Sequence, residues 1–232
     1  MSIHKAFILA GGKGTRCRPL TYETPKALIP VHGKPIIQHQ IELLRDYGVE
    51  EIILSIGYLG DQLLREFKDG SEHSVKISYV QEDMPLGTAG PLHLAKDRLT
   101  ESFYMLNSDV LTDINLGEFS DFHRKLGVSA SIALTPVDDP SSYGVVSLEG
   151  DKVLEFSEKH ETQKKSNLIN AGIYIIEPNV IGRVPEGKAM MERDVFPKLA
   201  SEKKLAGYRG DFRWYDSGTL EKYERAEEKW GK

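Results

Sequence analysis

The sequence has little cysteine and no excess of positive charge. Cys17 is the single cysteine among 232 residues, so an internal disulfide is excluded. This usage fits a reducing compartment, and we expect a cytoplasmic protein. The formal net charge is −5, so the sequence lacks the excess of basic residues that is typical of nucleic-acid-binding proteins. No apolar run approaches the roughly 20 residues of a membrane span, and we see no signal-peptide pattern. These absences favour small-molecule partners, with no nucleic acid and no membrane.

Several well-known catalytic motifs are absent too. The P-loop pattern G-x-x-x-x-G-K-[ST] fails because Lys13 is followed by Gly14. The dinucleotide fingerprint G-x-G-x-x-G fails because Cys17 occupies its last position. The seven histidines show no metal-binding spacing, and no G-x-S-x-G elbow occurs. The chain therefore matches neither a P-loop ATPase nor a typical nicotinamide oxidoreductase.

A glycine-rich segment follows the apolar run at 6–10, which reads as a buried strand. Three glycines within residues 11–14 let backbone N–H groups approach an anion without interference from a Cβ atom. Arg16 and Lys26 then supply positive charge. This pattern predicts phosphate binding, with a plain strand-to-helix turn as the alternative.

Hydrophobic spacing predicts an α/β fold. In the first half, we expect strands at 6–10, 51–56, 75–80 and 103–107, and helices at 35–47, 60–68 and 88–96. In the second half, we expect strands at 128–135, 143–147, 152–156, 171–176 and 205–209, and helices at 115–126, 192–200 and 219–229. Alternating strands and helices indicate a mostly parallel sheet, which binds ligands beyond the carboxyl ends of its strands. Residues 11–16 and Asp109 both follow predicted strands there.

Two aspartates are candidate magnesium ligands. Asp109 follows the strand 103–107, and Asp216 precedes the last predicted helix. Mg²⁺ takes one or two carboxylates and fills its other positions with water and phosphate oxygens. The alternative for Asp109 is a structural role as a turn residue or a helix cap. The alternative for Asp216 is that Asp216 or Thr219 caps the helix that follows.

Polar residues of the second half could bind a sugar phosphate. Lys159 offers a charge for the phosphate, while Glu158 and Asn170 offer oxygen atoms to sugar hydroxyls. Gly172 would let a sugar ring lie against the backbone. The alternatives are a solvated Glu–Lys pair and a plain turn.

Taken in chain order, these segments resemble the nucleoside-diphosphate-sugar pyrophosphorylases, also called sugar-1-phosphate nucleotidyltransferases. Seven motifs carry the resemblance over nearly the whole chain: 12–16 with 25–26, 86–90, 107–109, 143–146, 158–159, 170–172 and 214–219. Cys17, Ser108 and His160 depart from the usual pattern. The resemblance implies a Rossmann-like three-layer sandwich with a mostly parallel mixed sheet. It also implies one domain over 1–232, with a nucleotide-binding half (1–113) and a sugar-binding half with the C-terminal helix (114–232).

The resemblance further implies a reaction in which an NTP and a sugar 1-phosphate give an NDP-sugar and pyrophosphate. Arg16, Lys26 and Asp109 would be catalytic, and Asp109 and Asp216 would bind Mg²⁺. The implied nucleotide contacts are Leu9, Gly11, Gly12, Gly14, Thr15, Gln81, Gly87 and Thr88. The implied sugar-phosphate contacts are Gly144, Glu158, Lys159, Asn170 and Gly172. A homo-oligomer is compatible with this interpretation.

The choice of base depends on residues 81–83. A carboxylate of Glu82 or Asp83 would suit the two adjacent donors of guanine, whereas the Gln81 amide would suit a pyrimidine. The segment 85–92 looks most like that of mannose-1-phosphate guanylyltransferases. We therefore expect GTP and mannose 1-phosphate. The alternatives are a glucose-1-phosphate thymidylyl- or uridylyltransferase, and a non-catalytic subunit that senses nucleotide sugars.

Overall fold

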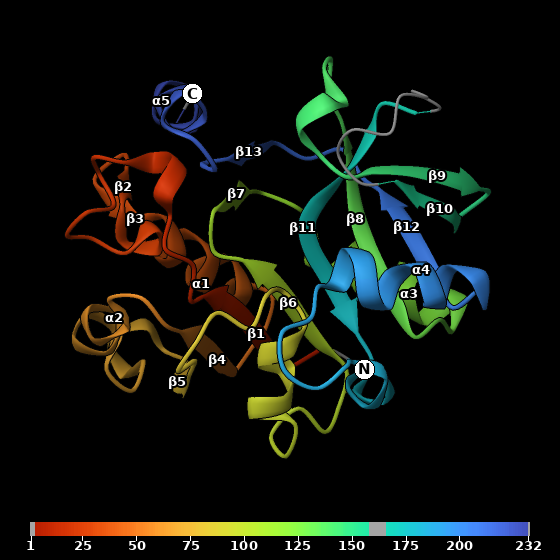
Figure 1. The fold of residues 1–232 in the computed structure, drawn as a ribbon, viewed down its shortest axis with the longest axis horizontal. Helices are drawn as coiled ribbons and strands as arrows, with labels where there is room; N and C mark the ends of the chain where they lie inside the picture. The colour runs from red at the N-terminus through yellow and green to blue at the C-terminus, as the bar shows by residue number, and fades with distance from the viewer. Residues whose placement is uncertain (1–2, 158–165, 232) are drawn as a thin grey trace. The chain divides into compact units, whose positions relative to one another are not determined.

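The computed structural model describes residues 3–157 and 166–231. The chain divides into two compact units (Figure 1). Unit 1 takes its residues from 1–85, 105–114 and 212–232, and unit 2 takes 86–104 and 115–211. Unit 1 is therefore built from the red and orange N-terminal segments, a short central segment and the blue C-terminal end.

Parallel strands form the centre of unit 1. The strand order is β5 (Lys76–Gln81), β4 (Glu51–Ile56), β1 (Lys5–Ala10) and β6 (Phe103–Asn107), of which β6 belongs to unit 1 from Met105 onward. β1 pairs with β4 and β4 with β5 in parallel register. Helices α1 (Ile36–Asp46) and α2 (Gly60–Phe67) lie in the connections from β1 to β4 and from β4 to β5, since parallel neighbours need a crossover connection.

Two short ladders complete unit 1. Strands β2 (Pro30–Val31) and β3 (Lys34–Pro35) form a hairpin. Strand β7 (Val110–Thr112) pairs antiparallel with β13 (Trp214–Asp216), and Asp216 lies opposite Val110. The last helix, α5 (Leu220–Lys229), follows β13 directly. The β7–β13 pair therefore brings the C-terminal segment beside Asp109.

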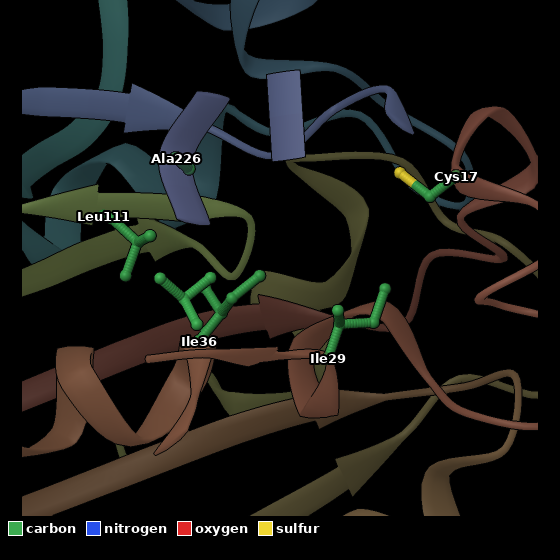
Figure 2. Packing of buried hydrophobic residues seen from close by; sticks show 6 residues of the cluster. Cys17, Ile29, Ile36, Leu111 and Ala226 are labelled. Carbon is green, nitrogen blue, oxygen red and sulfur yellow. The ribbon is translucent and has the colours of Figure 1, made fainter. Parts of the chain in front are cut away.

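A buried apolar cluster holds these distant segments together. It contains Cys17, Ile29, Val31, Ile36, Leu111 and Ala226, and Tyr215, Tyr223 and Trp230 pack against it. Figure 2 shows its labelled side chains, which come from the 3₁₀ turn Thr15–Cys17, from the residue after the 3₁₀ turn Lys26–Leu28, and from α1, β7 and α5. Fully burying an aliphatic side chain of this size stabilises a fold by about 1.5–3 kcal/mol. The cluster thus anchors the segments that carry Arg16, Asp109 and Asp216.

Unit 2 contains a mixed sheet. Its strand order is β11 (Leu168–Ile176), β8 (Ala130–Pro136), β12 (Leu205–Arg209), β10 (Lys152–Ser157) and β9 (Val145–Glu149). β8 and β12 pair in parallel, while the β11–β8, β12–β10, β10–β9 and β11–β9 pairs are antiparallel. The remaining helical elements of the described chain are 3₁₀ or π turns, apart from α3 (Leu116–Leu126) and α4 (Phe196–Ser201).

Helices α3 and α4 cover opposite faces of this sheet. Tyr208 lies opposite Ala133 in the β12–β8 pair, and Tyr174 lies opposite Ile132 in the β11–β8 pair. Since Ile132 and Ala133 are consecutive on β8, the two tyrosines point to opposite faces. The Tyr208 ring packs on Phe119 of α3, and the Tyr174 ring packs on Phe196 of α4. Unit 2 is therefore a three-layer sandwich, and the expected α/β class with a mixed sheet is confirmed.

Two predicted helices form, but not as regular α-helices over their whole length. Residues 88–96 contain a 3₁₀ helix, Gly90–Ala95, instead of an α-helix, and Pro91 at its start removes one backbone donor. The predicted helix at 192–200 begins as a π turn, Met191–Val195, and becomes α-helical only from Phe196. Pro197 has no N–H to continue a regular ladder, so the helix starts afresh there. Within the described residues, no helix combines the length and apolarity needed to cross a bilayer.

Candidate functional site

The glycine-rich segment forms an open loop at the carboxyl end of β1. Gly14 has a left-handed backbone (φ 59°) and precedes the 3₁₀ turn Thr15–Cys17. Its carbonyl accepts hydrogen bonds from Cys17 N (2.9 Å) and from Thr21 Oγ1 (2.8 Å). No atom lies within 4 Å of the point where a Cβ on Gly12 would be. The loop is thus fixed at Gly14 and open at Gly12, as backbone contact with an anion requires.

Lys26 and Asp109 form a close ion pair beside this loop. Lys26 Nζ lies 2.6 Å from Asp109 Oδ2, and the side chains are 12% and 29% exposed. Burial alone would raise the pKa of the Asp109 carboxyl, but the charge and hydrogen bond of Lys26 outweigh burial and hold this pKa below its ordinary value. Asp109 is therefore an ionised carboxylate near neutral pH. It lies between β6 and β7, so it does not cap a helix.

Asp216 lies next to Asp109. Ser217 donates both its backbone N–H (2.8 Å) and its Oγ–H (3.1 Å) to the Asp109 carbonyl. Lys222 Nζ donates to Asp216 Oδ2 at 2.9 Å, and Gly218 N–H donates to Asp216 Oδ1 at 2.8 Å. The cap of α5 is Thr219, not Asp216. The segments that carry the two candidate metal ligands therefore lie side by side, and each carboxylate is bonded to a lysine.

Arg16 and Cys17 join the same group. A Cβ placed on Gly218 would lie 2.9 Å from Asp216 Oδ1 and 3.6 Å from Arg16 Nη2, so both side chains border this glycine. The Cys17 thiol donates to the Ser217 carbonyl at 3.0 Å. Burial raises the pKa of this thiol, and the charges of Lys26, Asp109, Arg16 and Asp216 act on it with opposing signs. The charges of four site residues therefore act on one buried cysteine.

The oxygen ligands of this group fit magnesium. Asp109, which directly precedes β7, and Asp216, the last residue of β13, offer hard carboxylate oxygens from neighbouring segments. Within the described residues, no group of three or more His, Cys, Asp or Glu side chains could hold a metal. A cation bound here would therefore take its other ligands from water or from a phosphate, which is the usual arrangement for Mg²⁺.

The structure also places Glu82 beside the glycine loop. Glu82 Oε1 accepts a hydrogen bond from Ser55 Oγ at 2.7 Å, and it would lie 2.3 Å from a Cβ on Gly11. Gln81 is exposed, and its amide donates only weakly to the Glu82 carbonyl at 3.4 Å. The Glu82 carboxylate, at the carboxyl end of β5, thus borders the loop, whereas the predicted Gln81 is exposed. The sequence signal for Glu82 was its acidic side chain two residues after the strand predicted at 75–80.

In unit 2, Gly87 and Thr88 form a tightly packed turn. Gly87 has φ +80°, and a Cβ there would lie 2.4 Å from the Ala189 carbonyl oxygen. Thr88 Oγ1 donates to Glu192 Oε2 at 2.7 Å and accepts from Met191 N at 2.8 Å. These contacts give both residues a packing role in addition to any contact with a ligand.

Gly144, Asn170 and Gly172 lie together in unit 2. Asn170 N–H donates to the Gly144 carbonyl at 3.1 Å, and Asn170 Oδ1 accepts from Gly172 N at 2.9 Å. The Asn170 amide donates to Tyr174 Oη at 2.9 Å, and the β11–β8 register shifts between these two residues. The irregular strand therefore presents the predicted sugar-binding residues as a local group. Glu158 and Lys159 lie outside the described residues.

Comparisons with known proteins identify the family of this chain. The nucleotidyl transferase family model matches residues 5–232. Mannose-1-phosphate guanylyltransferase 1 of Arabidopsis thaliana is 43% identical over 226 residues, which are 94% of this chain and 62% of that protein. HddC from Yersinia pseudotuberculosis, complexed with GMP-PN, has a TM-score of 0.83, 28% identity, and coverage of 98% of this chain and 100% of its own.

A second similar structure is a Bacillus anthracis protein assigned as a glucose-1-phosphate thymidylyltransferase. Its TM-score is 0.86 at 27% identity, over 97% of this chain and 94% of its own. The chain spans about 62% of the length of the curated relatives that it matches. Because the family model covers nearly every residue, the chain belongs to the nucleotidyl transferase family.

Proposed function

We propose that this chain is a sugar-1-phosphate nucleotidyltransferase that joins GTP and mannose 1-phosphate to give GDP-mannose and pyrophosphate. The observation that carries the proposal is the group formed by Arg16, Lys26, Asp109 and Asp216 beside an open glycine loop. Such a group suits a triphosphate with a divalent cation. The names of the curated relatives support the choice of reaction.

The chemistry requires little from the protein beyond positioning and charge neutralisation. A phosphate oxygen of mannose 1-phosphate, already an anion, attacks the α-phosphorus of GTP. The new P–O bond forms while the bond from the α-phosphorus to the bridging oxygen breaks, and pyrophosphate leaves with that electron pair. No general base is needed, so the task is in-line orientation and stabilisation of charge.

Residues of unit 1 would hold the triphosphate. We assign the backbone N–H groups of residues 11–14 and the Arg16 guanidinium to the β- and γ-phosphates, with Leu9 and Thr15 bordering the nucleotide. Lys26 would neutralise charge that develops near the α-phosphate. Asp109 and Asp216 would hold Mg²⁺, which when bound supplies electrostatic stabilisation to phosphate oxygens.

Residues of unit 2 would recognise the sugar and part of the nucleotide. Asn170, Gly144 and Gly172 are assigned to sugar hydroxyls because their amide and backbone groups lie together. Glu158 and Lys159 are assigned to the sugar and its phosphate from the sequence motif alone. Gly87 and Thr88 keep their assignment to the nucleotide.

Glu82 favours guanine over a pyrimidine. Guanine presents two adjacent donors, N1–H and the 2-amino group, which one carboxylate can accept together. Ser55 bonds to one oxygen of Glu82 and so orients this carboxylate beside Gly11. HddC, one of the similar structures, is complexed with GMP-PN. A site built to accept guanine donors would reject a base that lacks them.

A pyrimidine-using enzyme is the second candidate. The similar protein from Bacillus anthracis is assigned to thymidylyl transfer onto glucose 1-phosphate. Gln81, one residue before Glu82, could pair with the acceptor–donor–acceptor edge of thymine or uracil.

A matrix assay tests the proposal. Pyrophosphate release is measured for GTP, UTP, dTTP, CTP and ATP against mannose 1-phosphate and glucose 1-phosphate. We expect the highest kcat/KM for GTP with mannose 1-phosphate. A preference for dTTP or UTP with glucose 1-phosphate would favour the second candidate. Binding of GDP-mannose without pyrophosphate release from any pair would indicate a nucleotide-sugar sensor.

We further propose that the protein acts in the cytoplasm on small molecules and, as the sequence allows, as a homo-oligomer. The single, buried Cys17 and the acidic net charge support a reducing compartment and argue against nucleic-acid partners.

A further inference from the structure

One buried glutamine in α1 has contacts that packing alone does not require. Gln40 is 2% exposed, and the other buried residues of α1 are apolar: Ile36, Ile37, Ile41 and Leu44. Burying a primary amide is unfavourable unless it forms hydrogen bonds, so a leucine or methionine would serve a simple packing role better. The role of Gln40 must therefore come from what its amide bonds to.

Both bonds of the Gln40 amide go to the segment that carries Asp109. Gln40 Nε2 donates to the Asn107 carbonyl at 2.8 Å and to the Val110 carbonyl at 2.7 Å. These carbonyls flank Ser108 and Asp109, so one side-chain group fixes both ends of the turn between β6 and β7. From the other side, the Asp109 carbonyl accepts two hydrogen bonds from Ser217.

We propose that Gln40 is a positioning residue for Asp109: its amide clamps the carbonyls on either side of this aspartate and so aims the carboxylate toward a divalent cation. Outer-shell partners of this kind typically change metal affinity by about 10- to 100-fold when they are removed. The inference rests on the proposed function, because that function makes Asp109 a metal ligand.

The test measures how strongly metal and nucleotide promote each other's binding. GTP affinity is determined by equilibrium binding with Mn²⁺ and again with EDTA, and the ratio of the two affinities reports the coupling. A change that merely loosened the fold would weaken both affinities alike and leave the ratio unaltered. A misplaced Asp109 carboxylate lowers the ratio, because it weakens the GTP affinity measured with Mn²⁺ but not the affinity measured with EDTA.

Three variants give a graded series. Gln40→Met keeps the length of the side chain but has no donor, so we expect the ratio to fall by about 10- to 100-fold. Gln40→Glu, buried against two carbonyls and hence protonated, keeps one donor and should give an intermediate value. Gln38→Met is the matched control, because the Gln38 amide bonds to Glu42 on the same helix and should leave the ratio unchanged.

Asp109→Ala separates failure of this inference from failure of the proposed function. If Asp109→Ala abolishes the Mn²⁺ enhancement while a folded Gln40→Met keeps it, only the positioning role is overturned. If Asp109→Ala keeps the enhancement, the proposed metal site itself is wrong. Circular dichroism and thermal melts verify folding. If Gln40→Met does not fold, the test is made with Gln40→Glu. If neither variant folds, the role of the amide is purely structural and the proposal is overturned.

Discussion

Lys26 and Asp109, separated by 83 positions in the sequence, approach each other to 2.6 Å between Nζ and Oδ2. The lysine keeps the pKa of the aspartate low even though burial would raise it. The same lysine borders the glycine loop, since a Cβ on Gly14 would lie 3.2 Å from Lys26 Cβ. This ion pair joins a proposed metal ligand to a proposed phosphate-binding residue, because Asp109 is assigned to Mg²⁺ and Lys26 to the α-phosphate.

Replacement of Lys26 by methionine should reduce kcat for pyrophosphate release by about 100- to 1,000-fold, the usual effect of losing one preorganised electrostatic contact. Lys34→Met is a matched control, because Lys34 forms a pair with Glu42 at the same 2.6 Å distance. Steady-state kinetics should show near wild-type turnover for the control. Equal losses in both variants would mean that the Lys26 pair is no more than structural.

Substitution of Glu82 by glutamine should lower kcat/KM for GTP by at least about 10-fold while affecting UTP and dTTP far less. The amide presents a donor to a guanine edge that itself donates. The ratio of kcat/KM for GTP to that for UTP, measured on the wild type and the variant, checks this. Asp83→Asn, one residue further along, is the control and should keep the wild-type ratio. An unchanged ratio in Glu82→Gln would remove Glu82 from base selection.

Gly87→Ala should destabilise the protein by at least about 2 kcal/mol, because a left-handed backbone costs an alanine about 1–2 kcal/mol before any clash is counted. The added Cβ would also approach the Ala189 carbonyl oxygen to 2.4 Å. Gly182→Ala serves as the comparison, since nothing lies within 4 Å of its Cβ position. Urea denaturation should leave this second variant within about 1 kcal/mol of wild type. Similar midpoints for the two variants would contradict the packing described at Gly87.

Stability should fall as the pH drops below about 6.5, the ordinary pKa of histidine. Burial lowers the pKa of His123, and its contact with Glu177 (3.0 Å) only partly opposes this. The unfolded chain therefore takes up a proton at a higher pH than the native state, so protonation favours unfolding between the two pKa values. Urea midpoints at pH 7.5, 6.5 and 5.5 measure the effect.

His123→Gln should flatten this pH dependence even if it costs stability at pH 7.5. His4→Gln is the control, because the His4 side chain is 44% exposed, and it should keep the wild-type dependence. A His123→Gln variant with the full wild-type slope would show that other groups cause the acid sensitivity.

Much of the fold could be predicted because local hydrophobic patterns determine it. The run at 6–10 and the pattern at 51–56 matched β1 and β4 closely, and the helix predicted at 115–126 begins at Leu116, after its cap Asn115. Strands β7 and β13 were missed, since three residues each give no usable period and their pairing joins segments about a hundred residues apart.

The site was predictable where residue type and strand ends coincide, as for Asp109 beyond β6. The contacts that support the site could not be predicted from the sequence. Gln40 reads as an ordinary helix residue, and Lys222 as a surface charge in the first turn of α5, yet both bond to the segments of the candidate metal ligands. Only tertiary packing reveals such partners, because no spacing along the chain relates them to the groups they hold.

The most direct test of the account is pyrophosphate release from GTP and mannose 1-phosphate with Mg²⁺, measured for the wild type, Asp109→Asn and Asp113→Asn. Asp113 lies four residues after Asp109, is 41% exposed and pairs with Arg213, so its variant is a matched control. The account predicts turnover by the wild type and the control, and a loss of about 100-fold or more for Asp109→Asn. Wild-type turnover by Asp109→Asn, or no pyrophosphate from the unaltered chain, would contradict it.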